Sequence, residues 1–194
     1  MKTNKIILPI TAILLATLFL AVMPTEAEAA IYEDTVRLHI LAESDSIEDQ
    51  TAKLMIRDKM LEKYSVLLDG KKSSIEAKAA LSDILDEIQA DCERWITEAG
   101  LSYTVKVTLL KEWYDTREYA DFTLPAGEYA SLKITLGKGE GQNWWCVMYP
   151  PLCLDVAVKK GNSAYTDTEG KLISDSGYNV KFKLLEVASL IFGR

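Results

Sequence analysis

The sequence predicts a single α+β domain, in which a mostly antiparallel sheet is covered on one face by two or three helices. Short segments near residues 36–40, 103–109 and 130–136 alternate apolar and polar side chains, as half-buried strands do. Longer segments near 47–64 and 74–99 repeat apolar side chains at helical spacing. Because each strand has one polar face, helices are expected to cover the other face.

Composition and charge fit a folded, acidic domain. The chain has 194 residues, a formal net charge of −7 and 48% hydrophobic residues, which is the balance of an ordinary globular protein. This length predicts one domain of roughly 150 residues once a leader is removed. The acidic balance, without a block of Lys or Arg, argues against binding to nucleic acid or electrostatic attachment to an anionic membrane.

The N-terminus has the pattern of a secretory leader. An apolar run at 6–23 follows a short basic start, and Ala27 and Ala29 supply the small residues that signal peptidase requires. We predict a signal peptide at 1–29, cleaved after Ala29, and an exported domain at 30–194. An uncleaved N-terminal anchor is the alternative, because the apolar run is close to the shortest that spans a bilayer.

The first predicted strand covers residues 36–40. It places Leu38 and Ile40 on a buried face, and Arg37 and His39 together on the opposite face.

A helix follows this strand and runs to about Tyr64. Ser46 with Asp49 approximates a capping box at its start. Apolar residues recur every seven positions and give a narrow stripe: Ile47, Leu54, Leu61 and Leu68.

The second predicted helix has the clearest periodicity in the chain. It begins at Ser73 or Ser74, and Gly100 is placed to end it as the residue after the cap. Cys92 lies among its apolar positions and is expected in the core.

Two more strands follow, at 103–109 and 130–136, separated by an aromatic and charged segment and a turn. The glycine-rich run 137–141 lacks the Lys-Ser/Thr ending of a phosphate loop and is interpreted as a hairpin or an adjustable lip. Residues 159–177 form a polar loop without periodicity. The last segment, 180–192, fits a helix, although its first part fits a strand equally well.

The segment NWWCVMYPPLC, at 143–153, is the first candidate for a contact surface. In a strand, Trp144 and Trp145 point to opposite faces, so one can enter the core while the other anchors a protein or stacks on a sugar. Packing of both rings under loops is the alternative. Cys146 and Cys153 flank a Tyr-Pro-Pro turn and are predicted to form a disulfide, with two buried thiols as the alternative.

Catalytic and metal motifs are weak. His39 is the single histidine, and a Cys–His dyad with Cys146 or Cys153 is formally possible. However, a histidine beside Arg37 is more typical of hydrogen-bonded support, and a disulfide would remove the thiols. A zinc site lacks ligands at suitable spacing. We therefore expect no catalytic residues, no metal and no cofactor.

Two runs of the sequence resemble the stage II sporulation protein R family of endospore-forming bacteria. They are RLHILAESDSIEDQ at 37–50, and the stretch from TLPAGEY to NWWCVMYPPLC at 123–153. Lys53, Arg57 and Asp58 also fit the pattern, from which the chain departs at two other positions, Glu43 and Asp115.

The resemblance implies a secreted signal without catalysis of its own. It would be made in the forespore and exported into the space between the two septal membranes. There it would trigger a membrane-embedded aspartic protease of the mother cell, which removes the pro-sequence of sigma factor E. The chain would meet a membrane only through an uncleaved leader. The alternative function is an exported cell-wall hydrolase or glycan-binding module that uses the aromatic residues.

The expected contact surface for the protease combines the two resembling runs. Its predicted members are Arg37, His39, Ser44, Asp45, Ser46, Asn143, Trp144, Trp145, Tyr149, Pro150 and Pro151.

Overall fold

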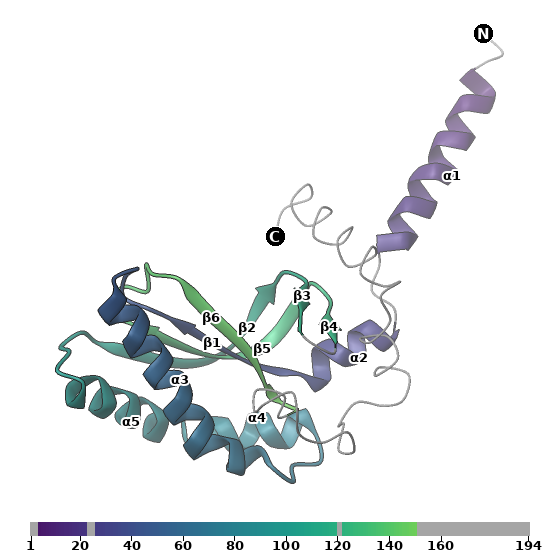
Figure 1. Ribbon diagram of the computed structural model, residues 1–194. Coiled ribbons are helices and arrows are strands. Elements are labelled where there is room, and N and C mark those ends of the chain that lie inside the picture. Colours follow the sequence, from purple (N-terminus) through teal and green to yellow (C-terminus); the bar gives the residue numbers. More distant parts are fainter. Residues whose placement is uncertain (1–3, 23–25, 120–121, 151–194) are drawn as a thin grey trace.

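The computed structural model describes residues 4–22, 26–119 and 122–150 (Figure 1). Within these ranges it confirms an α+β fold of five helices and a mixed four-stranded sheet, with a separate two-stranded sheet. The helices are α1 (Asn4–Val22), α2 (Glu26–Asp34), α3 (Ile47–Leu68), α4 (Ser74–Asp83) and α5 (Leu85–Glu98). The strands are β1 (Val36–Leu41), β2 (Val105–Tyr114), β3 (Arg117–Glu118), β4 (Thr123–Leu124), β5 (Gly127–Leu136) and β6 (Asn143–Tyr149).

The four-stranded sheet has the order β2-β5-β1-β6, so the earliest strand occupies an inner position. β1 runs parallel to β5 and antiparallel to β6, and β2 is antiparallel to β5. The sheet is therefore mostly antiparallel, as predicted. β5 and β6 lie on either side of β1, so the glycine-rich run that joins them crosses the end of β1. The interpretation of 137–141 as a hairpin is wrong.

One face of the sheet is covered by α3, α4 and α5, and we call it the helix-covered face (Figure 1). Its core joins Leu38 and Ile40 of β1 to Met60 of α3, Leu81 of α4 and Cys92 of α5, all with 0% exposure. The prediction that Cys92 belongs to the core is confirmed.

The helix α3 buries a different stripe from the one that recurs every seven residues. Its buried positions include Ala52, Ile56, Met60 and Tyr64, whereas Ile47 at the start of the stripe is 88% exposed. A seven-residue spacing marks one line along a helix of 3.6 residues per turn, but it does not tell which side of that line meets the core. Leu68, the last member of the stripe, is buried at 1% exposure. The cap was predicted correctly, because the side chain of Ser46 accepts from the Asp49 amide.

The second predicted helix is divided into α4 and α5 at Ile84, whose φ of −118° and ψ of 14° are not helical. Neither glycine nor proline marks this break in the sequence. Both predicted ends are confirmed: Ser73 caps α4 through the Glu76 amide, and Gly100 follows the α5 cap with a φ of 79°.

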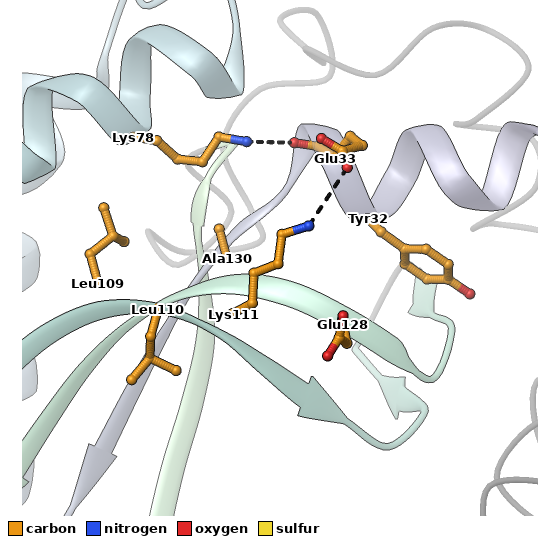
Figure 2. A pocket seen from close by; sticks show the side chains of 8 residues that line it. All are labelled: Tyr32, Glu33, Lys78, Leu109, Leu110, Lys111, Glu128 and Ala130. Atoms are coloured by element: carbon orange, nitrogen blue, oxygen red, sulfur yellow. Dashed lines mark hydrogen bonds and ion pairs between the residues drawn. The ribbon is translucent and has the colours of Figure 1, made fainter. Parts of the chain in front are cut away.

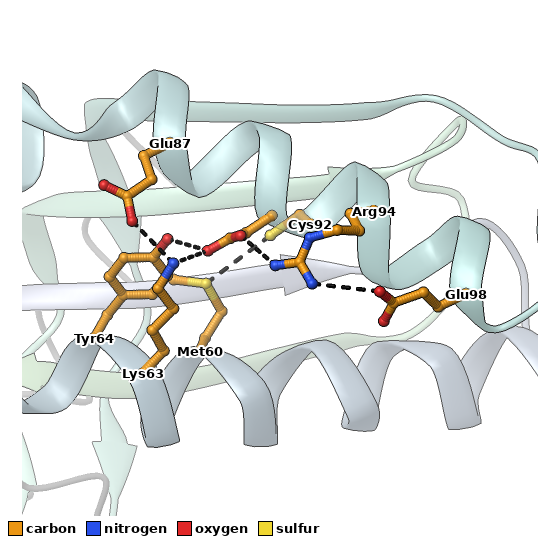
Figure 3. Close-up of polar contacts among 8 residues, drawn as sticks. Met60, Lys63, Tyr64, Glu87, Cys92, Arg94 and Glu98 are labelled. Carbon is orange, nitrogen blue, oxygen red and sulfur yellow. Dashed lines mark hydrogen bonds and ion pairs between the residues drawn. The ribbon is translucent and has the colours of Figure 1, made fainter.

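A network of charged side chains ties α3 to α5 at the edge of the helix-covered face (Figure 3). Asp91 of α5, which is 8% exposed, accepts hydrogen bonds from Lys63 and from the Tyr64 hydroxyl at 2.6 Å. Arg94 donates to its other oxygen at 2.5 Å. Burial alone would raise the pKa of the Asp91 carboxyl, but these three hydrogen bonds outweigh burial and lower the pKa to about 2.

The opposite face of the sheet, which carries Arg37 and His39 of β1, is also covered. A smaller apolar cluster lies there, formed by α2, the β3–β4 pair and the sheet, and its buried members are Ile31, Tyr114, Leu124, Tyr129 and Val147. Consequently Arg37 is 0% exposed and His39 only 6%. The expectation of one polar, solvated face on this strand is wrong, because α2 and the β3–β4 pair supply a second cover.

The predicted cleavage site falls inside α2. Ile31, two residues beyond Ala29, is fully buried, and the hydroxyl of Tyr32 donates to the carbonyl of Ala126 at 3.1 Å. Residues on the domain side of the site are thus fixed to the sheet. In the part of the chain that the structure describes, no helix is both long and apolar enough to cross a bilayer. The division into 1–29 and 30–194 stays a prediction.

Several predictions concern residues outside the described ranges. They are Pro151, Cys153, the loop 159–177 and the last segment 180–192. The pairing of Cys146 with Cys153 therefore stays a prediction.

Candidate functional site

A polar network centred on Glu112 of β2 lies on the opposite face of the sheet. One carboxylate oxygen, Oε2, is 2.8 Å from Nδ1 of His39 and accepts from the Ser131 hydroxyl at 3.1 Å. The other oxygen accepts from Lys133 Nζ at 2.6 Å. These side chains meet because three adjacent strands bring them together, with His39 of β1 directly beside Lys133 of β5 in the parallel register. Tyr114 extends the network through Ser131, at 2.6 Å.

The protonation of this network follows from its geometry. Burial alone would raise the pKa of the Glu112 carboxyl, but hydrogen bonds from Lys133 and His39 outweigh burial and lower the pKa. An ionised carboxylate can only accept hydrogen bonds. Nδ1 of His39 is therefore the donor in its hydrogen bond to Glu112.

An aromatic cavity adjoins the network, and we call it the His39 cavity. It has a volume of about 180 Å³ and is lined by His39, Glu112, Trp113, Tyr114, Asp115, Arg117 and Trp145. The ring of His39 stacks on that of Trp145, with centroids 5.6 Å apart. The guanidinium carbon of Arg117 lies 4.1 Å from the Trp145 ring centre. Nε2 of His39 and Nε of Arg117 are both buried without a hydrogen-bond partner among the described residues.

Arg37 lies beneath the same face and is fully enclosed. Its guanidinium carbon is 3.9 Å from the centre of the Tyr114 ring, and Nη2 donates to the Tyr119 hydroxyl at 2.8 Å. The structure gives no partner to Nε and Nη1 within its described ranges. Arg37 can support the face but cannot itself touch a partner.

The predicted contact residues Ser44, Asp45 and Ser46 take structural roles in the loop after β1. The hydroxyl of Ser44 donates to Asp49 at 2.5 Å, and Ser46 caps α3. A carboxylate oxygen of Asp45 accepts from the Gln142 amide at 2.6 Å. The bond from Gln142 to Asp45 and that from the Gly141 amide to the Ala42 carbonyl fasten this loop to the glycine-rich run.

The structure separates the other predicted contact residues between two faces. Trp145 lies beside His39, whereas Trp144 packs against the helix-covered core with Arg57 at 5.5 Å from its ring centre. The opposite orientation of the two rings was predicted correctly. Tyr149 is only 2% exposed, and its hydroxyl donates to the Lys71 carbonyl at 3.2 Å.

Burial also corrects the proposed anchor at the end of β6. Pro150 is buried like Tyr149, so neither offers a contact surface. Asn143 is exposed at the start of β6, beside Leu41 in the register and two residues before Trp145, but it does not line the His39 cavity. Of the predicted set, His39 and Trp145 are therefore the two that the structure brings together in one cavity.

Several residues of this site were not predicted: Glu112, Tyr114, Arg117, Ser131 and Lys133. A signal was present, because alternation in the strand predicted at 130–136 already places Ser131 and Lys133 on its polar face. What alternation cannot give is the neighbour of each strand, and the network depends on the order β2-β5-β1.

A second cavity, of about 230 Å³, lies between α2, α4 and the edge of the sheet (Figure 2). Lys78 and Lys111 both point toward Glu33 there: Lys78 Nζ donates to the Glu33 carbonyl at 3.3 Å, and Lys111 Nζ is 4.0 Å from its carboxylate. No lining residue has a buried polar atom without a partner. The His39 cavity is thus the better candidate for a binding site.

No cluster of three or more His, Cys, Asp or Glu side chains suited to a metal occurs in the described ranges. Ser131 and His39 both bond to the Glu112 carboxylate, so the histidine is not placed as a base for this hydroxyl.

Comparison with known proteins gives two matches. The sequence model of the family described as stage II sporulation protein R matches residues 32–159. The stage II sporulation protein R of Bacillus subtilis strain 168 is 38% identical over 123 residues, which are 63% of this chain and 55% of that protein. The alignment thus spans little more than half of the relative. No solved structure matches the chain.

Proposed function

The chain belongs to the stage II sporulation protein R family and has a role in sporulation, and from this membership we propose that it is a secreted signal between the two compartments of the sporulating cell. It is exported from the forespore into the space between the septal membranes. There it activates the membrane-embedded aspartic protease of the mother cell that processes pro-sigma E. It acts by binding and makes and breaks no bonds itself.

The leader pattern and the charge support the proposed location. The apolar run and the small residues Ala27 and Ala29 are typical of an exported chain. A net charge of −7 keeps the exported body from adhering to anionic lipid or nucleic acid.

The single observation that carries the proposal is the His39 cavity. Aromatic and charged side chains line this cavity on the face of the sheet that α3, α4 and α5 do not cover. Trp145 and Arg117 are half-buried there, and tryptophan and arginine are the residue types most enriched among energetic anchors of protein interfaces. The contact surface that we propose is therefore Trp145, Arg117, Trp113 and the exposed Asp115, with His39 at its base.

A ligand activates a protease only if it binds the active form more tightly than the resting form. A preshaped surface leaves more of its binding free energy available for this discrimination, because little is spent on ordering itself. The stacked His39 and Trp145 rings, held on adjacent strands, provide such a surface.

The test is co-expression of the full chain with the protease and its pro-sigma substrate. We expect Trp145→Ala to abolish processing, since loss of an interface anchor costs about 2 kcal/mol or more, or at least roughly thirtyfold in affinity. Trp144→Ala is the matched control, because its ring lies on the other face, and processing should persist. Equal loss in both variants, with folded and secreted protein, would remove the proposed surface.

Two further arms test location and mechanism. A chain without residues 1–29 should fail to trigger processing, because it is not exported. Incubation of the purified protein with peptidoglycan should give neither soluble fragments nor tight retention. Product formation would instead establish the cell-wall hydrolase.

A further inference from the structure

We propose that the free edge of β2 pairs with the same edge of a second copy of this chain. The two sheets then join in one continuous antiparallel sheet, with Leu110 on the two-fold axis. This interaction surface is separate from the His39 cavity and follows from the strand itself, whatever the function of the chain.

β2 is an edge strand, because it is first in the order β2-β5-β1-β6 and pairs with β5 alone. The ladder between β2 and β5 runs from Val105 to Tyr114 without a register shift. Bulges, prolines and short strands are the usual means by which proteins protect an exposed edge, and β2 has none of these. A long, regular edge of this kind is a template for another strand.

One hydrogen bond shows which backbone groups of β2 face away from β5. The amide of Val107 donates to Oε1 of Gln89 on α5 at 3.3 Å. Because successive residues of a strand direct their backbone groups to alternate sides, Leu109 and Lys111 also point theirs away from β5. These outward amides and carbonyls have no hydrogen bond to the described part of the chain. Two alternate residues of the edge are thus open to pairing.

The edge is accessible at these two residues. Leu109 and Lys111 border the cavity of about 230 Å³ between α2, α4 and the sheet (Figure 2). The side chains of Lys111 and Glu33, which form the ion pair beside it, are 70% and 71% exposed. A second strand can therefore reach the backbone of β2 here.

The two open residues flank Leu110, and this arrangement complements itself. When two antiparallel copies of β2 meet with Leu110 opposite Leu110, Leu109 of each copy lies opposite Lys111 of the other. Each such pair exchanges two hydrogen bonds, so every open amide and carbonyl acquires a partner. A two-fold contact requires a patch that is complementary to itself in this way.

The side chains agree with this register. Leu110 is 37% exposed and points to the other side of β2 from Leu109 (Figure 2). In the dimer it meets the same leucine in a non-hydrogen-bonded pair, where side chains approach most closely, and both leave water. Lys111 faces an apolar residue and Lys106 faces Tyr114, so no like charges lie directly opposite each other.

Two neighbouring registers fit less well. A register centred on Lys111 would place two lysines directly opposite each other, which is unfavourable. A register centred on Leu109 would pair Lys111 with Val107, whose amide is already bonded to Gln89. The register centred on Leu110 uses only the open backbone groups.

The dimer has a consequence for the His39 cavity. Leu110 lies on the same face of β2 as Glu112, two residues further on, and the two-fold axis is perpendicular to the sheet. Both His39 cavities therefore lie on one face of the joined sheet. Under the proposed function, one dimer presents two contact surfaces to its partner.

Disulfide cross-linking tests the register. With Leu110→Cys in the full chain, mild oxidation should give a covalent dimer, because the introduced thiols lie directly opposite each other. Thr108→Cys is the matched control on the same face of β2. Thr108 faces Glu112 of the second copy, so its own two copies lie about 14 Å apart and should not link. The unsubstituted chain, oxidised in parallel, accounts for the native cysteines.

A proline tests the backbone pairing. Lys111→Pro removes an amide that faces away from β5, so it preserves the ladder to β5 but takes one donor from each copy of the dimer. Sedimentation equilibrium of the full chain in a mild detergent should show self-association weakened about tenfold or more relative to Lys111→Ala, which keeps the amide. Urea unfolding verifies that both variants are folded.

The proposal is overturned if the unsubstituted chain is monomeric at every concentration, or if Thr108→Cys links as readily as Leu110→Cys. Equal association of Lys111→Pro and Lys111→Ala rejects it as well, as does a link through Leu109→Cys in place of Leu110→Cys. If a strand of another protein occupies this edge instead, the purified chain is monomeric and the second copy is rejected. None of these measurements involves the protease, so their failure would leave the test of the proposed function with Trp145→Ala unaffected.

Discussion

The two faces of the sheet differ in how far the chain satisfies its own polar groups. On the helix-covered face, Asp91 of α5 accepts hydrogen bonds from two side chains of α3 (Figure 3), although the hydroxyl of Tyr103 has no partner among the described residues. On the opposite face, the side chains of Arg37, His39 and Arg117 each keep a buried nitrogen without one in the same ranges. The first face is held by paired polar groups, whereas the second keeps buried nitrogens that the described part of the chain leaves unpaired.

The largest expected effect lies in the core of the helix-covered face. Ile56→Ala should lower the free energy of unfolding by about 3–4 kcal/mol, because it opens a cavity in a fully buried site. Ile47→Ala, on the same helix but 88% exposed, should change it by less than about 0.5 kcal/mol. Urea unfolding of both variants measures the difference. Similar costs would restore the seven-residue stripe as the buried face of α3.

The second largest effect on stability is expected in the hydrogen-bonded network around Asp91, which ties α3 to α5. Asp91→Asn should cost about 2 kcal/mol, since it removes the charge that Lys63 and Arg94 neutralise and weakens the bond to Tyr64. Glu98→Gln is the control, because the Arg94–Glu98 pair is half exposed on both sides and should contribute little. A negligible cost for Asp91→Asn would mean that this face is not held by its polar network.

Acid should weaken the same network. The pKa of Asp91 is about 2 in the folded chain and about 3.9 in an unfolded one. Its contribution to stability is therefore complete above about pH 5 and is lost as the pH falls toward 2, because the unfolded chain binds the proton first. We expect a loss of about 1–2 kcal/mol, discounted for the solvated partners. Chemical unfolding at several pH values should show this slope in the parent and not in Asp91→Asn.

The smallest effect on stability is expected on the opposite face. Arg37→Met removes the contact with Tyr114 and the bond to Tyr119, but it also removes a buried charge with two unsatisfied nitrogens. The two contributions nearly cancel, so the free energy of unfolding should change by less than about 1 kcal/mol. Thermal unfolding of the variant provides the measurement. A cost as large as that of Asp91→Asn would contradict the contrast between the faces.

Local sequence signals predicted the elements of this fold well. The caps at Ser46 and Ser73 and the end at Gly100 were all found, because a cap depends on residues within one turn of the helix. The strands β1, β2 and β5 and their inward faces followed from alternation, whereas α2, β3 and β4 were not predicted. The break at Ile84 was missed because no residue type marks it.

The site was harder to predict because it depends on contacts between distant segments. Glu112 meets His39 across 73 positions of the chain, and no local pattern shows that β1 and β2 both adjoin β5. Nor does the sequence show that α2 and the β3–β4 pair cover Arg37. For this reason the predicted set mixed residues of the His39 cavity with capping residues and with the buried Tyr149.

The inner position of β1 has a consequence for the order in which the chain can fold. β1 ends at Leu41, yet both of its neighbours, β5 and β6, come after residue 126. A chain that is synthesised from its N-terminus cannot assemble the sheet until nearly all of these residues are available, since long-range strand pairing waits for its last participant. For the export that we propose, late assembly would keep the nascent polypeptide extended and competent for translocation.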